Sequence, residues 1–184
     1  MKKIIYLITA LSILSCGTTK TSVKNDQNSY YPISGIDTKF KYADSDSYVL
    51  HKDLNVTRMK NGKKYSVRQI SYSWGKSTET MYRLDNGNVI YYDTKSNTEN
   101  MIMPNEPQVG FKWQSTDKAW EYEIMDLDAE LETPSEKYNG LLVMRATQIT
   151  GRDQTKLTEY LNYYQKGTGK IASVGNGKLM TYRL

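Results

Sequence analysis

Short apolar segments separated by turn residues occupy most of the chain. Asn61-Gly62 lies between segments 56–60 and 63–74, and this dipeptide between such segments is a strong β-hairpin signal. Similar pairs of segments are divided by Asp85-Asn86-Gly87-Asn88, Gly151-Arg152-Asp153 and Gly175-Asn176-Gly177. Successive segments follow at roughly 10 to 15 residues without a helical period, so the pattern predicts an all-β meander.

Two segments change the face on which their apolar residues lie. In the first, apolar residues alternate with acidic ones. The apolar residues occupy even positions before Met125, as Trp120, Tyr122 and Ile124, and odd positions after it, as Leu127, Ala129 and Leu131. One strand can make this change only through a bulge or a sharp bend. The change from Tyr65 and Val67 to Ile70, Tyr72 and Trp74 predicts a second slip.

Bulged strands curl a sheet, so the sequence predicts one strongly curved sheet or a partly open barrel. We expect a single all-β domain over residues 30–184, with about nine or ten antiparallel strands in meander order. Pro104 and Pro107 mark a loop, and Pro134 ends the long strand at Thr133.

The first 16 residues have another pattern. Lys2 and Lys3 precede an apolar run, 4–14, which is shorter than the ~20 residues of a membrane-spanning helix. This is typical of an export signal, and Ile13-Leu14-Ser15-Cys16 resembles the cleavage site of bacterial lipoproteins. The resemblance implies that residues 1–15 are removed and that Cys16 is acylated. The alternatives are an ordinary secretory signal, or an uncleaved apolar helix with a buried cysteine.

Residues 16–29 are expected to form the acylated cysteine and a flexible tether, because the segment after Cys16 is polar and aperiodic. Surface lipoproteins of Bacteroidetes often carry an acidic run here, whereas this segment has Lys20, Lys24 and Asp26. That comparison favours the inner leaflet of the outer membrane, with the domain facing the periplasm. Exposure at the cell surface is the alternative.

Composition narrows the classes of partner. The chain has 25 basic and 20 acidic residues, and removal of Lys2 and Lys3 leaves 23 against 20, a net charge of +3. The sequence has no run of basic residues that could bind along the phosphate backbone of a nucleic acid, so nucleic acid is not an expected partner. The single cysteine excludes a disulfide within the chain, and we expect no cofactor.

The chain contains four short phrases: Tyr30-Tyr31-Pro32-Ile33, Pro107-Gln108-Val109-Gly110-Phe111-Lys112-Trp113, Thr133-Pro134 before Tyr138 to Val143, and Tyr163-Tyr164 before Gly167-Thr168-Gly169-Lys170-Ile171. Together these phrases resemble an uncharacterised group of secreted bacterial β domains related to the TapB-like families. Glu136 stands where the group usually has glycine. The resemblance implies a curved antiparallel sheet and supplies no catalytic residues.

Motifs for chemistry are weak. Gly75-Lys76-Ser77-Thr78 lacks the earlier glycine of a phosphate loop, where Ile70 stands. His51 is the sole histidine, and the sequence has no Gly-x-Ser-x-Gly motif whose serine it could activate as a base. We therefore expect no catalytic role for it.

We also expect no metal site. Same-face residues on a strand are ~6.6 Å apart, too far for the alternate acids Asp126, Asp128, Glu130 and Glu132 to share one calcium ion. Asp44-Ser45-Asp46-Ser47 lacks the later ligands of a calcium loop.

Aromatic residues are the remaining candidates for a site. In a doublet on a strand one ring faces each side of the sheet, so one ring can line a concave face. The candidates for contact with a lipid, glycan or peptide are Trp74, Tyr91, Tyr92, Trp113, Trp120, Tyr163 and Tyr164. The alternative is that they are core and sheet-surface residues without a binding role.

The sequence favours a non-enzymatic, acyl-anchored binding module. The first alternative is a structural or assembly subunit that pairs through an edge strand. The second is a hydrolase that uses paired carboxylates on glycans.

Overall fold

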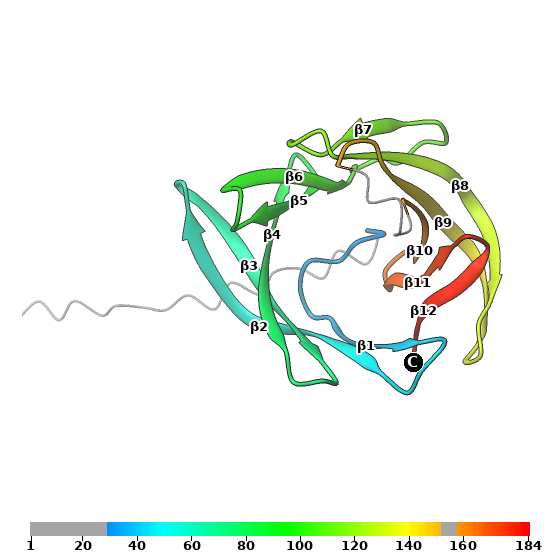
Figure 1. The fold of residues 1–184 in the computed structure, drawn as a ribbon. Helices are drawn as coiled ribbons and strands as arrows, with labels where there is room; N and C mark the ends of the chain where they lie inside the picture. Colours follow the sequence, from blue (N-terminus) through cyan, green and yellow to red (C-terminus); the bar gives the residue numbers. More distant parts are fainter. Residues whose placement is uncertain (1–28, 152–157) are drawn as a thin grey trace, which may run out of the picture.

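The computed structural model describes residues 29–151 and 158–184. They form 12 β-strands in one antiparallel sheet that curls around an interior without closing (Figure 1). The strands are β1 Asp37–Tyr42, β2 Tyr48–Lys60, β3 Lys63–Tyr72, β4 Ser77–Asp85, β5 Asn88–Asp93, β6 Thr98–Met103, β7 Lys112–Gln114, β8 Trp120–Glu132, β9 Lys137–Gln148, β10 Glu159–Gln165, β11 Gly169–Gly175 and β12 Lys178–Arg183. The predicted all-β meander is confirmed, with more strands than expected. The signal, Cys16 and residues 17–28 lie outside the described residues.

The sheet order is β6-β5-β4-β3-β2-β1-β12-β11-β10-β9-β8-β7. The first and last strands therefore pair in its middle, and the two edges are β6 and β7, which follow each other along the chain. Trp113 on β7 donates its indole N–H to the carbonyl oxygen of Met101 on β6 at 3.0 Å, and the backbone N–H of Thr116 donates to Asn100 at 2.7 Å. Side chains hold this seam together where no strand ladder forms.

The tight turns explain why the meander forms. Both residues have positive φ in Asn61-Gly62 (49° and 73°), Asn86-Gly87 (49° and 82°) and Asn176-Gly177 (49° and 70°). This is the two-residue turn whose twist matches that of the flanking strands, and asparagine and glycine adopt it at low cost. All three predicted hairpins are confirmed. Part of the fourth turn, after Gly151, lies outside the described residues.

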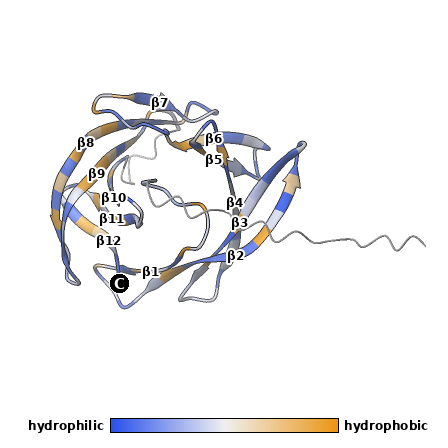
Figure 2. Cartoon of the chain, turned by 180° about the vertical axis from the view of Figure 1, so that it is seen from behind, coloured by the Kyte–Doolittle hydropathy of each residue, from blue (hydrophilic) through white to orange (hydrophobic). Residues whose placement is uncertain are grey.

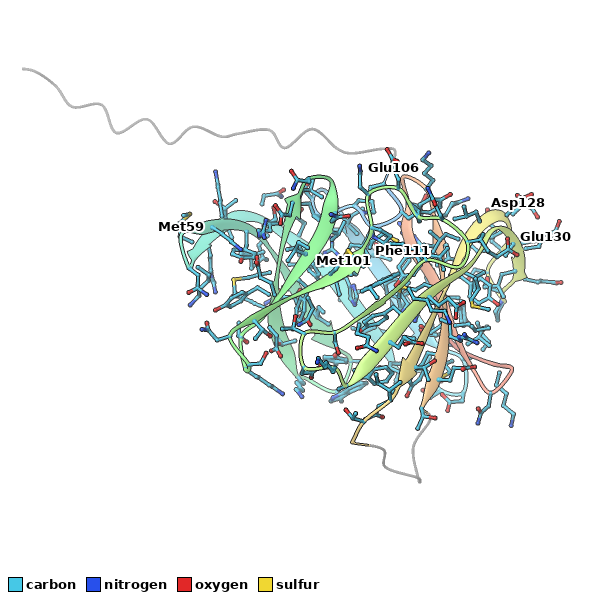
Figure 3. The ribbon with its side chains drawn as sticks, turned by 90° about the horizontal axis from the view of Figure 1, so that it is seen from above. Met59, Met101, Glu106, Phe111, Asp128 and Glu130 are labelled. Carbon is cyan, nitrogen blue, oxygen red and sulfur yellow. The ribbon has the colours of Figure 1, made fainter. Side chains whose placement is uncertain are left out.

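The bulge predicted near Met125 is confirmed. The pairing of β8 with β9 shifts between Ile124 and Asp126 and again twice before Leu131. In the first half of β8 the even-numbered side chains face the interior. In the second half the acidic side chains are exposed, and Figure 3 shows Asp128 and Glu130 at the rim of the molecule.

The slip predicted within β3 is wrong. The pairing of β3 with β4 runs from Ser66 to Ser71 without a shift. Tyr65 and Val67 pack in a small cluster on one face of the sheet, and Tyr72 faces the interior from the other. The apolar residues change face while the backbone alternates regularly. The irregularity lies instead on β2, between Asp53 and Thr57.

Residues 29–36, the inner strap, enter the interior of the curled sheet (Figure 1). The ring of Tyr31 lies 5.5 Å from that of Tyr82 and 6.1 Å from that of Tyr164. The strap is held at both ends, since Gly167 donates its N–H to the Ser29 carbonyl at 2.9 Å and Gly35 donates its N–H to Asp53 at 2.5 Å. Tyr30, Tyr31 and Ile33 of the strap pack against the buried core of this interior.

The interior cluster comprises Tyr82, Val89, Met103, Ile124, Leu142, Met144 and Tyr164. Two smaller clusters lie around Tyr138 and Ile171 and around Tyr65 and Val67. Figure 2 shows hydrophobic and hydrophilic positions alternating along β8 and β9, as expected for strands with two different faces. The strands and clusters given above lie within residues 29–151 and 158–184, so a chain that begins at Lys20 keeps all of them. No helix in the described ranges is long and apolar enough to cross a membrane.

Candidate functional site

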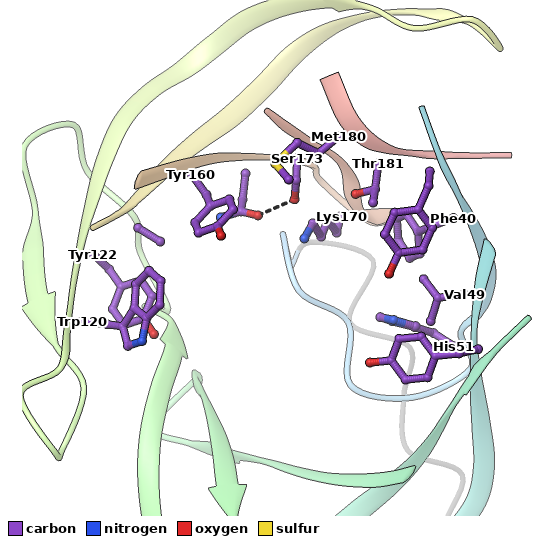
Figure 4. A pocket seen from close by; sticks show the side chains of 14 residues that line it. Phe40, Val49, His51, Trp120, Tyr122, Tyr160, Lys170, Ser173, Met180 and Thr181 are labelled. Atoms are coloured by element: carbon purple, nitrogen blue, oxygen red, sulfur yellow. Dashed lines mark hydrogen bonds between the residues drawn. The ribbon is translucent and has the colours of Figure 1, made fainter. Parts of the chain in front are cut away.

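The interior contains a cavity of about 440 Å³ beside the inner strap (Figure 4). This volume is within the range of small-molecule sites. The cavity is lined by Phe40, Tyr42, Val49, His51, Tyr72, Trp120, Tyr122, Ala146, Tyr160, Asn162, Lys170, Ser173, Met180 and Thr181. We call it the main cavity.

Two aromatic walls define the main cavity. Trp120 and Tyr122 on β8 and Tyr160 on β10 lie on one side, and Phe40 on β1 and His51 on β2 lie opposite (Figure 4). Each wall follows from strand alternation, which places every second side chain of a strand on the concave face. Trp120 and Tyr122 are the residues whose even positions predicted an inward orientation.

Trp74 lies beside one end of the main cavity. Its ring is 4.7 Å from that of Tyr72 and 6.0 Å from that of Tyr42, which both line the cavity. With 57% of its surface exposed, Trp74 connects this lining to the solvent-facing surface. Tyr42, Tyr72 and Trp74 therefore mark the outer end, which we call the mouth.

A β-bulge turns Lys170 into the main cavity. Ala172 pairs with Tyr163, and both lie in the cluster on the far face of the sheet. In a regular strand Lys170 would share the face of Ala172, because side chains repeat every second residue. The pairing shifts so that Lys170 lies opposite Tyr164, with Ile171 as the extra residue. The bulge re-aims one cationic side chain, a recognised role of bulges near functional sites.

The ammonium group of Lys170 has no counter-charge among the described residues. No hydrogen bond or ion pair joins it to any of them, and the half-buried side chain lines the main cavity. Burial lowers the pKa of Lys170 from 10.5 to about 8, because the charged form is poorly solvated there. The group is still mostly protonated at pH 7, so the main cavity is electropositive.

Polar groups beside Lys170 supply further hydrogen-bond donors. Ser173 donates its hydroxyl proton to the Asn162 side-chain oxygen at 2.7 Å, which leaves the amide N–H groups of Asn162 without a partner among the described residues. His51 packs edge-on against Phe40 at 5.1 Å. Its pKa is lowered to about 4 by burial and by the positive charges of Arg68 and Lys170, so the imidazole is neutral at pH 7.

A second hollow of about 40 Å³ lies between the inner strap and the sheet, and it shares Phe40, His51 and Lys170 with the main cavity. Arg68 lines this inner hollow and is only 4% exposed. Its guanidinium donates to the Pro32 carbonyl at 2.8 Å and lies 5.1 Å from the Tyr82 ring, but its Nε–H has no partner among the described residues.

The aromatic candidates are distributed over several parts of the fold. Trp120 lines the main cavity, Trp74 lies at the mouth, and Trp113 stacks on Tyr122 at 5.3 Å while bridging the seam. The two tyrosine doublets divide between the faces of the sheet: Tyr91 and Tyr164 pack with the interior cluster, and Tyr92 and Tyr163 pack on the other side. A binding role for these residues stays a prediction.

Sequence reasoning missed Phe40, Asn162 and Lys170. The alternation of Lys170, Ala172 and Val174 would place all three on one face, so no signal in the sequence indicated that Lys170 turns inward. Only the pairing partner of the strand reveals the bulge.

The main cavity combines apolar walls with hydrogen-bond donors and one cation. No carboxylate lines either hollow within the described ranges. The described residues also contain no group of three or more histidine, cysteine or acidic side chains that could hold a metal ion. The arrangement suits an apolar molecule that carries an acceptor or anionic group.

Comparison with known proteins gives one structural likeness. No protein-family model and no curated protein sequence matches the chain. The backbone is similar to the crystal structure of a candidate lipoprotein from Parabacteroides distasonis, with 13% sequence identity and a TM-score of 0.46, over 84% of this chain and 95% of that one. The resemblance to the TapB-like families stays a prediction.

Proposed function

We propose that this protein is an acyl-anchored envelope lipoprotein whose β domain binds a small, largely apolar ligand in the main cavity. The observation that carries the proposal is the cavity itself, which is preformed, aromatic on both sides and bordered by an exposed tryptophan. Rigid aromatic walls with a few polar groups are typical of small-molecule sites.

The anchoring part of the proposal depends on the sequence. Charge, a short apolar run and a small residue before Cys16 support export and acylation. The tether composition supports the outer membrane with the domain facing the periplasm. There the domain would meet amphiphilic molecules at close range.

The alternative of an assembly subunit that recruits a partner strand has less support. A receptive edge needs free backbone groups, and the two sheet edges β6 and β7 face each other across a seam. Trp113 and Thr116 bond to β6 from the β7 side of that seam. Neither edge is openly available along its length.

Binding of N-phenylnaphthylamine, an uncharged aromatic probe, tests the proposed cavity site. Energy transfer from tryptophan should report saturable binding with one probe per chain, and a variant that keeps only Trp120 should retain the transfer. Ala146→Leu and Thr181→Met fill the cavity from β9 and β12 and should each weaken binding at least tenfold. Thr57→Phe, at an exposed position of β2, is the control. Equal binding by the filled variants would refute the cavity site.

A further inference from the structure

The main cavity has a charge that the protein leaves unpaired. Among the described residues that line it, Lys170 is the one lysine or arginine, and no aspartate or glutamate accompanies it there. Transfer of an ammonium group out of water costs several kcal/mol unless an anion or polar partners compensate. A protein that turns this side chain inward by a bulge carries that cost in its empty state, and an anion bound at Lys170 would remove it.

The groups that face Lys170 come from every neighbouring element. They are Tyr31 on the inner strap, His51 on β2, Arg68 on β3, Tyr160 and Tyr164 on β10, and Arg183 on β12. None of them is an acid. This set therefore contains no carboxylate that could neutralise the ammonium.

The two arginines are already engaged. Arg68 donates to the Pro32 carbonyl and Arg183 donates to the Thr168 carbonyl, each at 2.8 Å. Both acceptors are uncharged carbonyls, which satisfy hydrogen bonds without neutralising the guanidinium charges. Lys170 is the cation of this set that lines the main cavity and has no acceptor at all among the described residues, so it is the group with which one carboxylate of a cavity ligand can form a charge-assisted hydrogen bond.

Resting on the proposed function, we infer that the ligand is a monoanionic amphiphile, an apolar chain that ends in one carboxylate, and that this carboxylate binds at Lys170. Asn162 is well placed to donate its amide N–H to the same carboxylate, because it lies across the pairing of β10 with β11 and lines the same cavity. The chain then extends between Trp120, Tyr122 and Phe40 toward the mouth.

The orientation follows from the two ends of the main cavity. The inner end, at Lys170, adjoins the inner strap and the polar inner hollow. The outer end, at Tyr42 and Tyr72, is aromatic and adjoins the exposed ring of Trp74. A carboxylate placed at the mouth would leave the ammonium unpaired, so the acid group lies inward.

Titration calorimetry with decanoate and decanol tests this inference, on a chain from Lys20 to Leu184 at pH 7. The two probes share a chain length and differ in charge. We expect decanoate to bind the wild type at least tenfold more tightly than decanol does. Lys170→Met should weaken decanoate binding about 10- to 100-fold, as for loss of a charge-assisted hydrogen bond, and should leave decanol binding unchanged. Lys166→Met removes a charge from the exposed turn of the same hairpin and is the matched control.

The outcomes separate the inference from the function on which it rests. If neither probe binds the wild type, the proposed apolar ligand site fails and the inference fails with it. If both probes bind equally and Lys170→Met changes neither affinity, the binding function stands and the acidic ligand is refuted. If Lys166→Met weakens decanoate as much as Lys170→Met does, general surface charge explains the preference and the site at Lys170 is refuted.

Discussion

Lys170 and Ala172 lie two positions apart on β11 yet face opposite sides of the sheet. Ala172 packs with Tyr163 and Tyr182 on the far face, and Lys170 points into the main cavity. The extra residue Ile171 makes this difference, because it shifts the pairing with β10 by one position. A charged residue at the start of a strand would ordinarily face solvent. Here the fold directs it into an aromatic interior.

The first prediction concerns the stability of the empty protein. Lys170→Met should raise the free energy of unfolding at pH 7 by about 1–3 kcal/mol, since it removes an unpaired buried charge. The pKa of Lys170 is about 8 in the folded state and 10.5 in the unfolded state. The penalty is therefore complete below pH 8 and vanishes as the pH rises to 10.5.

Urea unfolding of both chains at pH 7 and pH 10 measures this difference. The advantage of Lys170→Met should shrink at the higher pH. The comparison cancels the contribution of the buried tyrosines Tyr31 and Tyr164, whose pKa values are raised by burial in both chains. A variant less stable than the wild type at pH 7 would show that the ammonium has a stabilising partner.

The second prediction concerns acid. His51 has a folded pKa of about 4 against 6.5 when unfolded, so the unfolded state binds more protons between these values and stability falls as the pH drops from 6.5 to 4. We expect His51 to account for a loss of about 2–3 kcal/mol over that window. His51→Gln should flatten the curve there, as measured by urea unfolding at several pH values. An unchanged slope would contradict the burial of a neutral imidazole.

The third prediction concerns the inner strap. Tyr31→Ala should lower the free energy of unfolding by about 2–4 kcal/mol, because the ring packs between Tyr82 and Tyr164 and leaves a void when removed. Tyr31→Phe keeps the ring and its packing and should cost only about 1 kcal/mol. Thermal and urea unfolding compare the two. Similar small losses for both variants would show that the strap does not pack inside.

The fourth prediction concerns the seam between β6 and β7. Trp113→Phe removes the indole N–H that bonds to Met101, and should cost about 1 kcal/mol. The amides of β6 should then exchange hydrogen faster than they do in the wild type, whereas those of β2, which pairs with strands on both sides, should not change. Hydrogen exchange with mass spectrometry reads both strands in one experiment. If β6 exchanges at the same rate in the variant as in the wild type, the seam does not depend on this bond.

The fifth prediction concerns the anchor. Cys16→Ala should move the protein from the membrane fraction to the soluble fraction of envelope extracts, because the proposed acyl chains are lost. Ser22→Ala lies after the cysteine and outside the cleavage motif, and it serves as the control. Detergent-dependent membrane attachment of Cys16→Ala would contradict acylation at this residue.

Local chemistry explains how much of the fold was predictable. Asparagine–glycine pairs specify their turn without help from the rest of the chain, so these hairpins were read correctly. The parity change around Met125 was also visible, because each half of β8 alternates regularly. The similar change in β3 misled the prediction, since it reflects two separate apolar clusters and not a backbone slip.

The site was less predictable because it depends on pairing partners. Trp120 follows from a clear alternation, but the bulge at Ile171 is defined by how β11 pairs with β10. The inner strap is equally hidden: Tyr30 to Ile36 shows no strand pattern, and only the curled sheet supplies the interior that receives Tyr31.

Native mass spectrometry on tag-free Lys20 to Leu184, exported behind a cleavable secretory signal and purified from the cell envelope without refolding, tests the central claim most directly. The account predicts one added mass per chain that disappears on denaturation, is recovered as a negative ion with one acidic group, and is reduced in Lys170→Met but not in Lys166→Met. A chain of bare mass under the same gentle conditions, together with no uptake of added decanoate, would contradict a ligand in the main cavity.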